Sequence, residues 1–295
     1  MAAVLEVSGV SKSFRRNTPV LKGIDLKIET GELVALIGAS GSGKSTLIRL
    51  IAGMERVDAN DGAIAVLGQQ TQVNGRRLST QRRLRREIGV VFQQFNLVGR
   101  LSLLKNVLVG RLGRAPGWRG TLGVFSHEDK VRALRSLERV GMVEFAHQRA
   151  SQLSGGQQQR GAIARALTQE AQIILADEPI ASLDPAAADL VMEILADINR
   201  QDGVTVIVSL HQIDHAFKHC KRIIALKDGR VVFDGPTADV TPQDLSALYG
   251  MGMSAMSAAA EPSGIRPNGH AVRETVGSRP DRPQQARLSA VVSAS

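Results

Sequence analysis

The chain has 295 residues, a net charge of +9 and an isoelectric point near 10.3. Its 43% of hydrophobic residues excludes an intrinsically disordered chain, and no apolar run approaches the roughly 18 residues of a membrane-spanning helix. The single cysteine, Cys220, excludes an intramolecular disulfide and a cysteine-rich metal site. Without a secretory signal in the first residues, we expect a cytosolic protein whose basic balance favours nucleic acid, a membrane surface or an anionic ligand.

The positive charge is concentrated in two segments. Six arginines lie between residues 76 and 86 beside a single acidic residue, Glu87, and five arginines face three acidic residues between 251 and 295. The rest of the chain therefore carries a net charge of only +2. Any argument from bulk charge to a polyanionic partner rests on these two segments.

From residue 4 to about residue 250, β-branched runs alternate with amphipathic stretches and short polar turns. This alternation predicts an α/β fold with a mainly parallel sheet, whereas the early strands, with their Gly-Glu and Asn-Asp-Gly turns, favour an antiparallel accessory sheet. Strands are predicted at residues 33–37, 64–67, 88–92, 173–176, 205–210, 222–226 and 230–233. Helices are predicted at 157–167 and at 189–199, the latter with a stripe of Leu190, Val191, Ile194, Leu195 and Ile198.

Two regions depart from the alternation. Residues from about 95 to 165 lack β-branched runs, which predicts a helical insertion within the domain of residues 4–250. After residue 250 the composition changes to Ala, Ser, Pro, Gly and Arg without periodicity. We therefore expect residues 251–295 to form a largely disordered tail.

The strand at 33–37 runs into a loop of the form G-x-x-x-x-G-K-S, and an apolar helix pattern follows. In this context the pattern indicates a phosphate-binding loop, because glycines let backbone N–H groups turn inward and the helix points its positive N-terminus at the anion. We expect Lys44 to neutralise the β- and γ-phosphates and the Ser45 hydroxyl to join a Mg²⁺ shell. The residues assigned to the nucleotide are Gly38, Ala39, Ser40, Gly41, Ser42, Gly43, Lys44, Ser45 and Thr46.

A pair of acidic residues follows the strand at 173–176. We expect Asp177 to hold Mg²⁺ through water, and Glu178 to polarise the attacking water as a general base. General-base catalysis contributes about 10²–10⁴ in rate. Adjacent carboxylates after an apolar strand are also common as plain loop residues, so the pair alone does not establish a catalytic site.

Residues 153–160, Leu-Ser-Gly-Gly-Gln-Gln-Gln-Arg, lie between the two motifs. Here the chain resembles the ATP-binding-cassette (ABC) ATPases, whose defining signature is LSGGQ, and the resemblance covers residues 4–250. It identifies Phe14 as the aromatic that stacks on adenine and Gln93 as the Q-loop glutamine, with Gln94 as its immediate competitor. Further matches are the D-loop aspartate Asp184, the switch histidine His211 and the signature residues Ser154, Gly155, Gly156 and Gln157.

The resemblance implies a P-loop NTPase cassette with a RecA-like core, an antiparallel β subdomain and a helical subdomain at about 95–165. Its cofactors would be ATP and Mg²⁺, and its active form a head-to-tail dimer. Each ATP would lie between Lys44 of one copy and Ser154 of the other, with hydrolysis coupled to dimer opening. The implied catalytic residues are Glu178, His211 and Gln93, and the implied metal set is Ser45, Gln93 and Asp177.

Within the resembled family, the chain has one cassette and no fused membrane span, and Lys44 and Ser154 are separated by only 110 residues. That separation is too short for the long coiled-coil insertions of cassettes that act on DNA. We therefore expect an importer subunit on the cytoplasmic face of the inner membrane. Its partners would be two transmembrane permease subunits and, indirectly, an extracytoplasmic substrate-binding protein, and no nucleic acid is expected.

Several stretches are similar to phosphonate-import ATP-binding subunits: residues 93–102 followed by 106–108, residues 113–119 followed by 122–125, and residues 148–151 and 176–185. The one departure in the phosphate loop is Ala39, where the family more often has proline. The alternatives are import of another small anion or of a polar amino acid. From a different class, a soluble cassette ATPase acting on nucleic acid is favoured only by the charge.

Three further features each have more than one interpretation. His211, His215 and His219 next to Cys220 have a spacing that suits a metal, but His211 is expected to end a strand, so solvated histidines are favoured. The arginine run 76–86 lacks the aromatics of a nucleic-acid reader, which favours a solvated basic helix over contact with anionic lipid. Trp118 either contacts the permease or anchors a loop.

Overall fold

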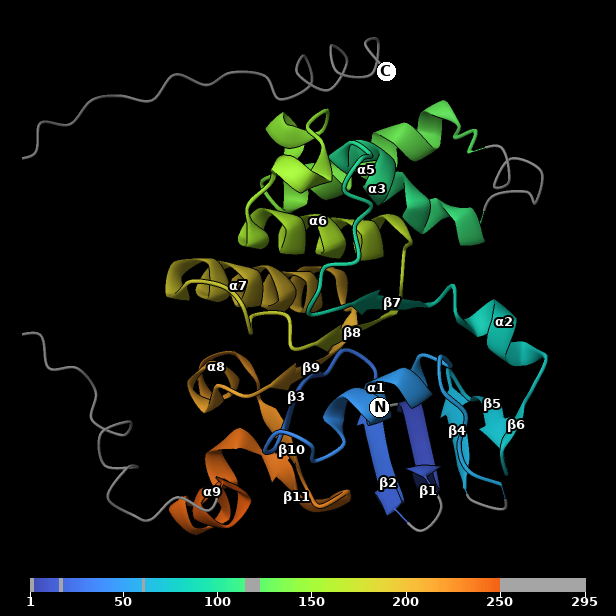
Figure 1. The fold of residues 1–295 in the computed structure, drawn as a ribbon, viewed down its shortest axis with the longest axis vertical. Coiled ribbons are helices and arrows are strands. Elements are labelled where there is room, and N and C mark those ends of the chain that lie inside the picture. Colours follow the sequence, from blue (N-terminus) through green and yellow to red (C-terminus); the bar gives the residue numbers. More distant parts are fainter. Residues whose placement is uncertain (1–2, 16–17, 60–61, 115–122, 250–295) are drawn as a thin grey trace, which may run out of the picture.

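The computed structural model describes residues 3–15, 18–59, 62–114 and 123–249, and within them two β-sheets carry the fold. Helix α1 lies beside the smaller sheet, and the helices α3, α5 and α6 form a layer beyond α7 (Figure 1). Within these ranges no helix is both long and apolar enough to cross a membrane. The tail expected at 251–295 and Trp118 lie outside the described residues.

The smaller sheet is antiparallel and has the strand order β2-β1-β4-β5-β6. Its strands are β1 (Ala3–Arg15), β2 (Thr18–Glu29), β4 (Ala63–Val66), β5 (Gln69–Val73) and β6 (Arg76–Arg77). Leu67 and Gly68 join β4 to β5 with φ of 50° and 69°, which is the geometry of a two-residue hairpin turn that matches strand twist. The predicted antiparallel accessory sheet is confirmed.

The larger sheet has the order β11-β10-β3-β9-β8-β7, and only β11 runs antiparallel to its neighbour. Its strands are β3 (Leu33–Ile37), β7 (Ile88–Val91), β8 (Ile173–Asp177), β9 (Thr205–Leu210), β10 (Arg222–Lys227) and β11 (Arg230–Pro236). All the predicted strands lie at or within two residues of observed ones, except that β11 continues three residues further. The predicted α/β fold with a mainly parallel sheet is confirmed.

Eight α-helices and four 3-10 turns complete the described ranges. They are α1 (Lys44–Ile51), α2 (Thr80–Leu84), α3 (Leu103–Leu108), α5 (His127–Arg139), α6 (Gly155–Thr168), α7 (Pro185–Asp202), α8 (Ile213–His219), α9 (Pro242–Tyr249), η1 (Val109–Gly113), η2 (Val143–Phe145), η3 (Ala150–Gln152) and η4 (Thr237–Asp239). The predicted helices at 157–167 and 189–199 lie inside α6 and α7. Leu190 is the exception in the predicted stripe: it is 40% exposed because it lies about 100° around the helix from Val191, at the margin of the buried face.

Strand β3 separates the two hydrophobic cores of the molecule. All five of its residues are buried, and side chains alternate between the two faces of a strand. Leu33, Ala35 and Ile37 belong to the core shared with α3, α5, α6 and α7. Val34 and Leu36 belong to the core shared with α1 and the antiparallel sheet. The continuous apolar run therefore has two faces to cover, and its last residue, Ile37, is held rigidly where the phosphate loop begins.

The arginine run 76–86 does not form one solvated helix, so that prediction is only partly right. Arg76 and Arg77 form the short strand β6, and the helix α2 covers only Thr80–Leu84. Arg77 and Arg85 donate to the backbone carbonyls of Met54 and Gly53. Two arginines of the run thus stabilise the end of α1 rather than forming a free cationic face.

One buried amide organises the segment that leads from β7 into α3. Asn106 is 1% exposed and its side-chain oxygen accepts from the N–H of Val98 at 2.7 Å. Its Nδ2 lies within 3.1–3.4 Å of the carbonyl oxygens of Val98, Leu101 and Ser102. The three carbonyls also accept backbone N–H groups, from Leu101, Ala150 and Asn106 itself, so the Val98 N–H is the group that depends on this side chain.

Replacing Asn106 with leucine, which has a similar branched shape, is expected to lower the free energy of unfolding by about 1–3 kcal/mol, because the Val98 N–H loses its partner and the buried amide contacts are lost. Urea unfolding measures the change. The control, Lys105→Leu, alters an exposed neighbour on the same helix and should stay within about 0.5 kcal/mol. Equal stability of the two variants would show that the loop does not depend on Asn106.

Candidate active site

The predicted site residues follow three neighbouring parallel strands, β3, β9 and β8, at one edge of the larger sheet. The register pairs Ile37 of β3 with Leu210 of β9, and Asp177 of β8 with Ser209 of β9. Because parallel strands end at the same edge, the segments that follow them lie together, which is the usual ligand position in an open α/β sheet. The phosphate loop, the acidic pair and His211 leave the sheet at this edge.

The phosphate loop, residues 38–43, turns through three glycines with positive φ. Gly38, Gly41 and Gly43 have φ of 150°, 81° and 106°. A Cβ on Gly38 would lie 2.2 Å from the carbonyl oxygen of Leu226, so a larger residue cannot occupy that position without moving the strand. Gly43 is the N-cap of α1, and the helix therefore begins directly at Lys44. The observed backbone is the glycine-dependent turn that the sequence pattern predicts.

Lys44 is held inside the loop. Its side chain is buried, and its Nζ donates to the carbonyl oxygens of Gly38 at 2.7 Å and Ala39 at 3.1 Å. Burial lowers the pKa of Lys44, while the nearby carboxylates of Glu178 and Asp177 act in the opposite direction. The ammonium is thus placed against a loop that lacks an anion of its own, and a phosphate would provide the countercharge.

Ser45 and Asp177 form the candidate magnesium position. The Ser45 hydroxyl donates to Asp177 Oδ1 at 2.8 Å, across the boundary between α1 and β8. The two groups are hard oxygen ligands of the kind that Mg²⁺ prefers, which fits the predicted metal set. In the same loop the Ser42 hydroxyl is buried and has no hydrogen-bond partner, so the loop keeps a polar atom free for a ligand.

Ser209 is a residue of this site that the sequence analysis missed. It is fully buried, its hydroxyl donates to Asp177 Oδ1 at 3.0 Å, and it accepts the N–H of Glu178 at 2.8 Å. One hydroxyl therefore fixes both acidic residues relative to β9. The only sequence signal is a serine inside an otherwise apolar strand, where a polar side chain needs a buried partner.

Glu178 and His211 face each other beyond the strand ends. His211 Nε2 lies 2.5 Å from Glu178 Oε1, and Glu178 has φ of 49°, a left-handed conformation that is rare for a glutamate. Both residues line a cavity of about 100 Å³ together with Ser209 and Ala181. At about 30 Å³ per liquid water, the cavity has room for a small cluster of water molecules against the carboxylate.

The signature segment has the predicted helix cap but belongs to another part of the chain. Ser154 is the N-cap of α6, its hydroxyl accepts from Gln157 N–H at 3.3 Å, and the Gln157 side chain accepts from Ser154 N–H at 2.8 Å. This reciprocal pair is a capping box. Next to it, a Cβ on Gly155 would approach Leu183 and Phe95, not the phosphate loop. Ser154 itself is exposed and presents a helix N-terminus outward.

Three further predicted residues lie outside the cluster of Lys44 and Asp177. Phe14 is 55% exposed on β1 with the Lys12 ammonium 5.2 Å from its ring centre. Asp184 caps α7, accepting from Ala187 N–H at 2.9 Å. Gln93 is exposed, and within the described part of the chain no hydrogen bond joins it to the metal set.

A second missed residue, Arg165, links the segment after Gln93 to α6. Its guanidinium donates to the carbonyl oxygens of Asn96 at 2.6 Å and Phe95 at 3.3 Å. Phe95 and Asn96 both have positive φ, so the arginine stabilises a strained turn. Burial lowers the pKa of Arg165, yet an arginine stays charged under all ordinary conditions.

An open pocket of about 650 Å³ lies on the helical part of the chain. Its walls come from η2 and the segment that leads to the signature. Glu144, Phe145, His147, Gln148, Arg149 and Gln152 line it. An aromatic ring among charged and amide side chains suits a partner protein better than a small apolar ligand.

Comparison with known proteins gives concordant results. A family model described as ABC transporter matches residues 21–181. A phosphonates import ATP-binding protein of Pseudomonas aeruginosa (strain UCBPP-PA14) is 59% identical over 251 residues, which cover 85% of this chain and 90% of the relative. Proteins of the same description from Stutzerimonas stutzeri and Maricaulis maris are 58% and 53% identical, covering 86% and 84% of this chain and 92% and 94% of theirs.

Solved structures agree with the sequence relatives. An ATP-binding cassette solved as a dimer with bound ADP and Pi superposes with a TM-score of 0.69 at 36% identity, covering 79% of this chain and 98% of that one. A nucleotide-free cassette from an ABC transporter gives a TM-score of 0.71 at 20% identity, covering 88% of this chain and all of the other. The second likeness bears on the fold alone.

Proposed function

Because the chain belongs to the ABC transporter family, as an ATP-binding protein of that family, we propose that it hydrolyses ATP to drive the import of phosphonates through a separate permease. The observation that carries the proposal is the junction of the phosphate loop with Ser45, Asp177 and Glu178 at one sheet edge. The 59% identity to a phosphonates import ATP-binding protein supports the substrate class.

ATP binding is assigned to the loop and to the aromatic on β1. The β- and γ-phosphates would accept hydrogen bonds from backbone N–H groups of residues 38–46 and from the Lys44 ammonium. On binding, this ammonium would exchange the carbonyl oxygens of Gly38 and Ala39 for phosphate oxygens. The ring of Phe14 is 55% exposed, with the Lys12 ammonium over it, and would stack on the adenine through its exposed surface. The net charge of the chain has no part in this recognition, because all the assigned hydrogen-bond donors belong to the phosphate loop and the start of α1.

Magnesium belongs between Ser45 and Asp177. The Ser45 hydroxyl and the Asp177 carboxylate would hold it, with Gln93 as the further ligand carried on the loop after β7. The bound ion supplies charge neutralisation at the phosphate oxygens. Ser209 keeps the Asp177 carboxylate aimed at this position and, because Ser209 is buried, does so without competition from water.

Hydrolysis is assigned to Glu178 and His211. The Glu178 carboxylate accepts a proton from a water in the adjoining cavity as that water attacks the γ-phosphorus, and the bond from the γ-phosphorus to the bridging oxygen breaks to leave ADP. His211, in contact with Glu178 Oε1, holds the carboxylate in place. The site therefore combines an oriented base with a phosphate cradle.

The second half of each site comes from another copy. ABC cassettes form dimers, as in the relative solved with ADP and Pi. In a head-to-tail pair, Ser154 of the partner subunit and its Gly155, Gly156 and Gln157 would meet the γ-phosphate through the exposed N-terminus of α6. Asp184 lies at the start of α7 and would be part of the same interface.

Coupling to transport is assigned to the pocket on the helical part, residues 95–165. The pocket around Phe145 and Arg149 is large enough for a helix end of a permease subunit. Two such permease subunits would hold the chain at the cytoplasmic face of the cell membrane. An extracytoplasmic binding protein would deliver the substrate to them. The comparisons do not favour a nucleic-acid partner, because the three sequence relatives named above are described as phosphonates import ATP-binding proteins.

The general-base assignment predicts the behaviour of Glu178→Gln. Turnover of ATP should fall by about 10²–10⁴, because the amide cannot accept the proton, and an ATP-bound dimer should accumulate. Size-exclusion chromatography with ATP and a phosphate-release assay measure the two effects. The matched control, Glu138→Gln, changes an exposed carboxylate on α5. Near-normal turnover in Glu178→Gln would overturn the assignment.

Ser209→Ala tests the hydroxyl that joins Asp177 to Glu178. Turnover should fall by roughly tenfold or more, since losing a buried hydrogen-bond partner costs about 1–3 kcal/mol, and half-maximal activity should need more Mg²⁺. ATP affinity without Mg²⁺ should change little. Ser136→Ala is the control, because it removes another buried, hydrogen-bonded serine hydroxyl, on α5. If both variants keep full activity, Ser209 has only a structural role.

The substrate class is tested in vesicles that contain the chain with its permease. A binding protein loaded with an alkylphosphonate should stimulate ATP hydrolysis and uptake, and Glu178→Gln should abolish both. The same system with phosphate or a polar amino acid should give little stimulation. Stimulation by the amino acid alone, or only by DNA or RNA, would replace the phosphonate assignment.

A further inference from the structure

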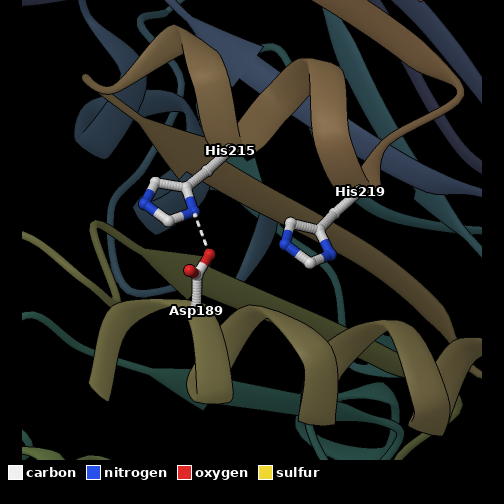
Figure 2. A group of neighbouring side chains, drawn as sticks. All are labelled: Asp189, His215 and His219. Atoms are coloured by element: carbon white, nitrogen blue, oxygen red, sulfur yellow. Dashed lines mark ion pairs between the residues drawn. The ribbon is translucent and has the colours of Figure 1, made fainter. Parts of the chain in front are cut away.

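Two histidines and an aspartate meet between α7 and α8, away from the nucleotide site. Figure 2 shows Asp189 of α7 directed toward the rings of His215 and His219 on α8. One nitrogen of each ring and one oxygen of the carboxylate lie within 4.8 Å of one another. Within the residues that the structure describes, this is the one group of three or more such side chains that could hold an ion.

The arrangement follows from helix geometry on both sides. His215 and His219 are four residues apart, so their rings project from the same face of α8 and stack with 6.2 Å between ring centres. H-x3-H is also a common ligand spacing in zinc sites. The pair therefore points two imidazoles at the same turn of α7, where Asp189 provides an oxygen.

The buried nitrogens of these rings lack hydrogen bonds. His215 Nδ1 and His219 Nε2 are both inaccessible to solvent and accept or donate no hydrogen bond. Burial, followed by the charges of Lys218 and His215, lowers the pKa of His219, which favours the neutral imidazole that binds metals. His215 Nδ1 has only its 3.5 Å contact with Asp189 Oδ1, and buried polar atoms without hydrogen bonds are rare in native proteins, so both nitrogens could accept an ion between them.

We propose that Asp189, His215 and His219 form a binding site for a divalent late transition-metal ion such as Zn²⁺, with one coordination position left for water. Two imidazoles and a carboxylate are ligands suited to Zn²⁺, Cu²⁺ or Ni²⁺ and not to Mg²⁺. The His215 Nδ1 to Asp189 Oδ1 distance is already 3.5 Å. Two ligands about 2.0–2.1 Å from a tetrahedral ion lie about 3.3 Å apart, so mainly the His219 ring has to close in.

The neighbouring side chains define what this site excludes. His211 precedes α8 and contacts Glu178, so it is not a ligand, as its predicted position at a strand end implies. Cys220 is buried and burial raises the pKa of its thiol to about 12, which keeps it from acting as a thiolate ligand. The sequence prediction of solvated histidines is wrong for His215, whose side chain is only 15% exposed.

Lys218 competes with the ion for Asp189. Its Nζ donates to Asp189 Oδ1 at 2.9 Å, and this hydrogen bond is the main reason that the pKa of Asp189 is lowered. The exposed ammonium has solvent to move into, so the carboxylate can exchange it for a metal. The competition gives the site a distinctive test, because removing the amine should strengthen metal binding.

The experiment titrates Zn²⁺ into the nucleotide-free, full-length chain without added Mg²⁺, using a competing fluorescent chelator, and repeats the titration with Co²⁺ to record its visible absorption. We expect one ion per chain, the spectrum of a four-coordinate Co²⁺ site and a higher melting temperature with Zn²⁺. His215→Gln and His219→Gln should each weaken Zn²⁺ binding at least about tenfold, the size of loss that follows from disturbing even an outer-shell partner. Lys218→Met should tighten it.

Controls separate this site from other histidines. His127→Gln, His147→Gln, His211→Gln and His270→Gln should leave Zn²⁺ binding unchanged, and melting curves without metal should show that every variant is folded. The proposal is overturned if the unmodified chain binds no Zn²⁺ at micromolar concentrations, if His215→Gln and His219→Gln bind as tightly as the unmodified chain, or if His211→Gln or His270→Gln removes the binding. A Lys218→Met variant that binds less tightly would equally contradict it.

Discussion

The contacts of one carboxylate, that of Asp177, organise the site. It accepts from Ser45 at the start of α1 and from Ser209 in β9, so it joins the helix after β3 to the two neighbouring strands. Those strands are buried on both faces and pair in parallel, with Asp177 beside Ser209. The packed core therefore fixes the positions of Ser45, Asp177 and Ser209 at the edge of the sheet.

The sequence predicts the pieces of this arrangement better than their contacts. Strand β3 and its glycine loop are local features: an apolar run, a fixed glycine spacing and an apolar helix, all within 20 residues. Ser209, Arg165 and Asp189 were missed because each acts on residues distant along the chain, and periodicity identifies a face without identifying its partner. The second copy and the permease raise the same difficulty, since the capping box of Ser154 and Gln157 is local and does not indicate what the exposed helix end would meet.

Several arginines outside the two basic segments have a structural role within the described residues. Arg111 bridges Asp129 and Glu170, Arg114 pairs with Glu87, and Arg222 joins Glu32 to Asp234 across the larger sheet. These guanidinium groups are partly buried and bind carboxylates or carbonyls, for which their planar donor fork is well suited. These arginines, like Arg77 and Arg85 of the run 76–86, therefore hold together segments of this chain.

Helix α6 carries the signature serine at its N-terminus and, three turns later, Arg165, which grips the carbonyls of Phe95 and Asn96 just after Gln93. Such charge-assisted hydrogen bonds contribute about 1.5–3 kcal/mol each. In the proposed dimer, α6 would therefore move as one rigid helix. A shift of the segment after Gln93, beside one copy's magnesium position, would move the N-terminus of α6 that contacts the other copy's ATP. Information about one nucleotide would reach the second through a single rigid body, with no chain of small rearrangements between them.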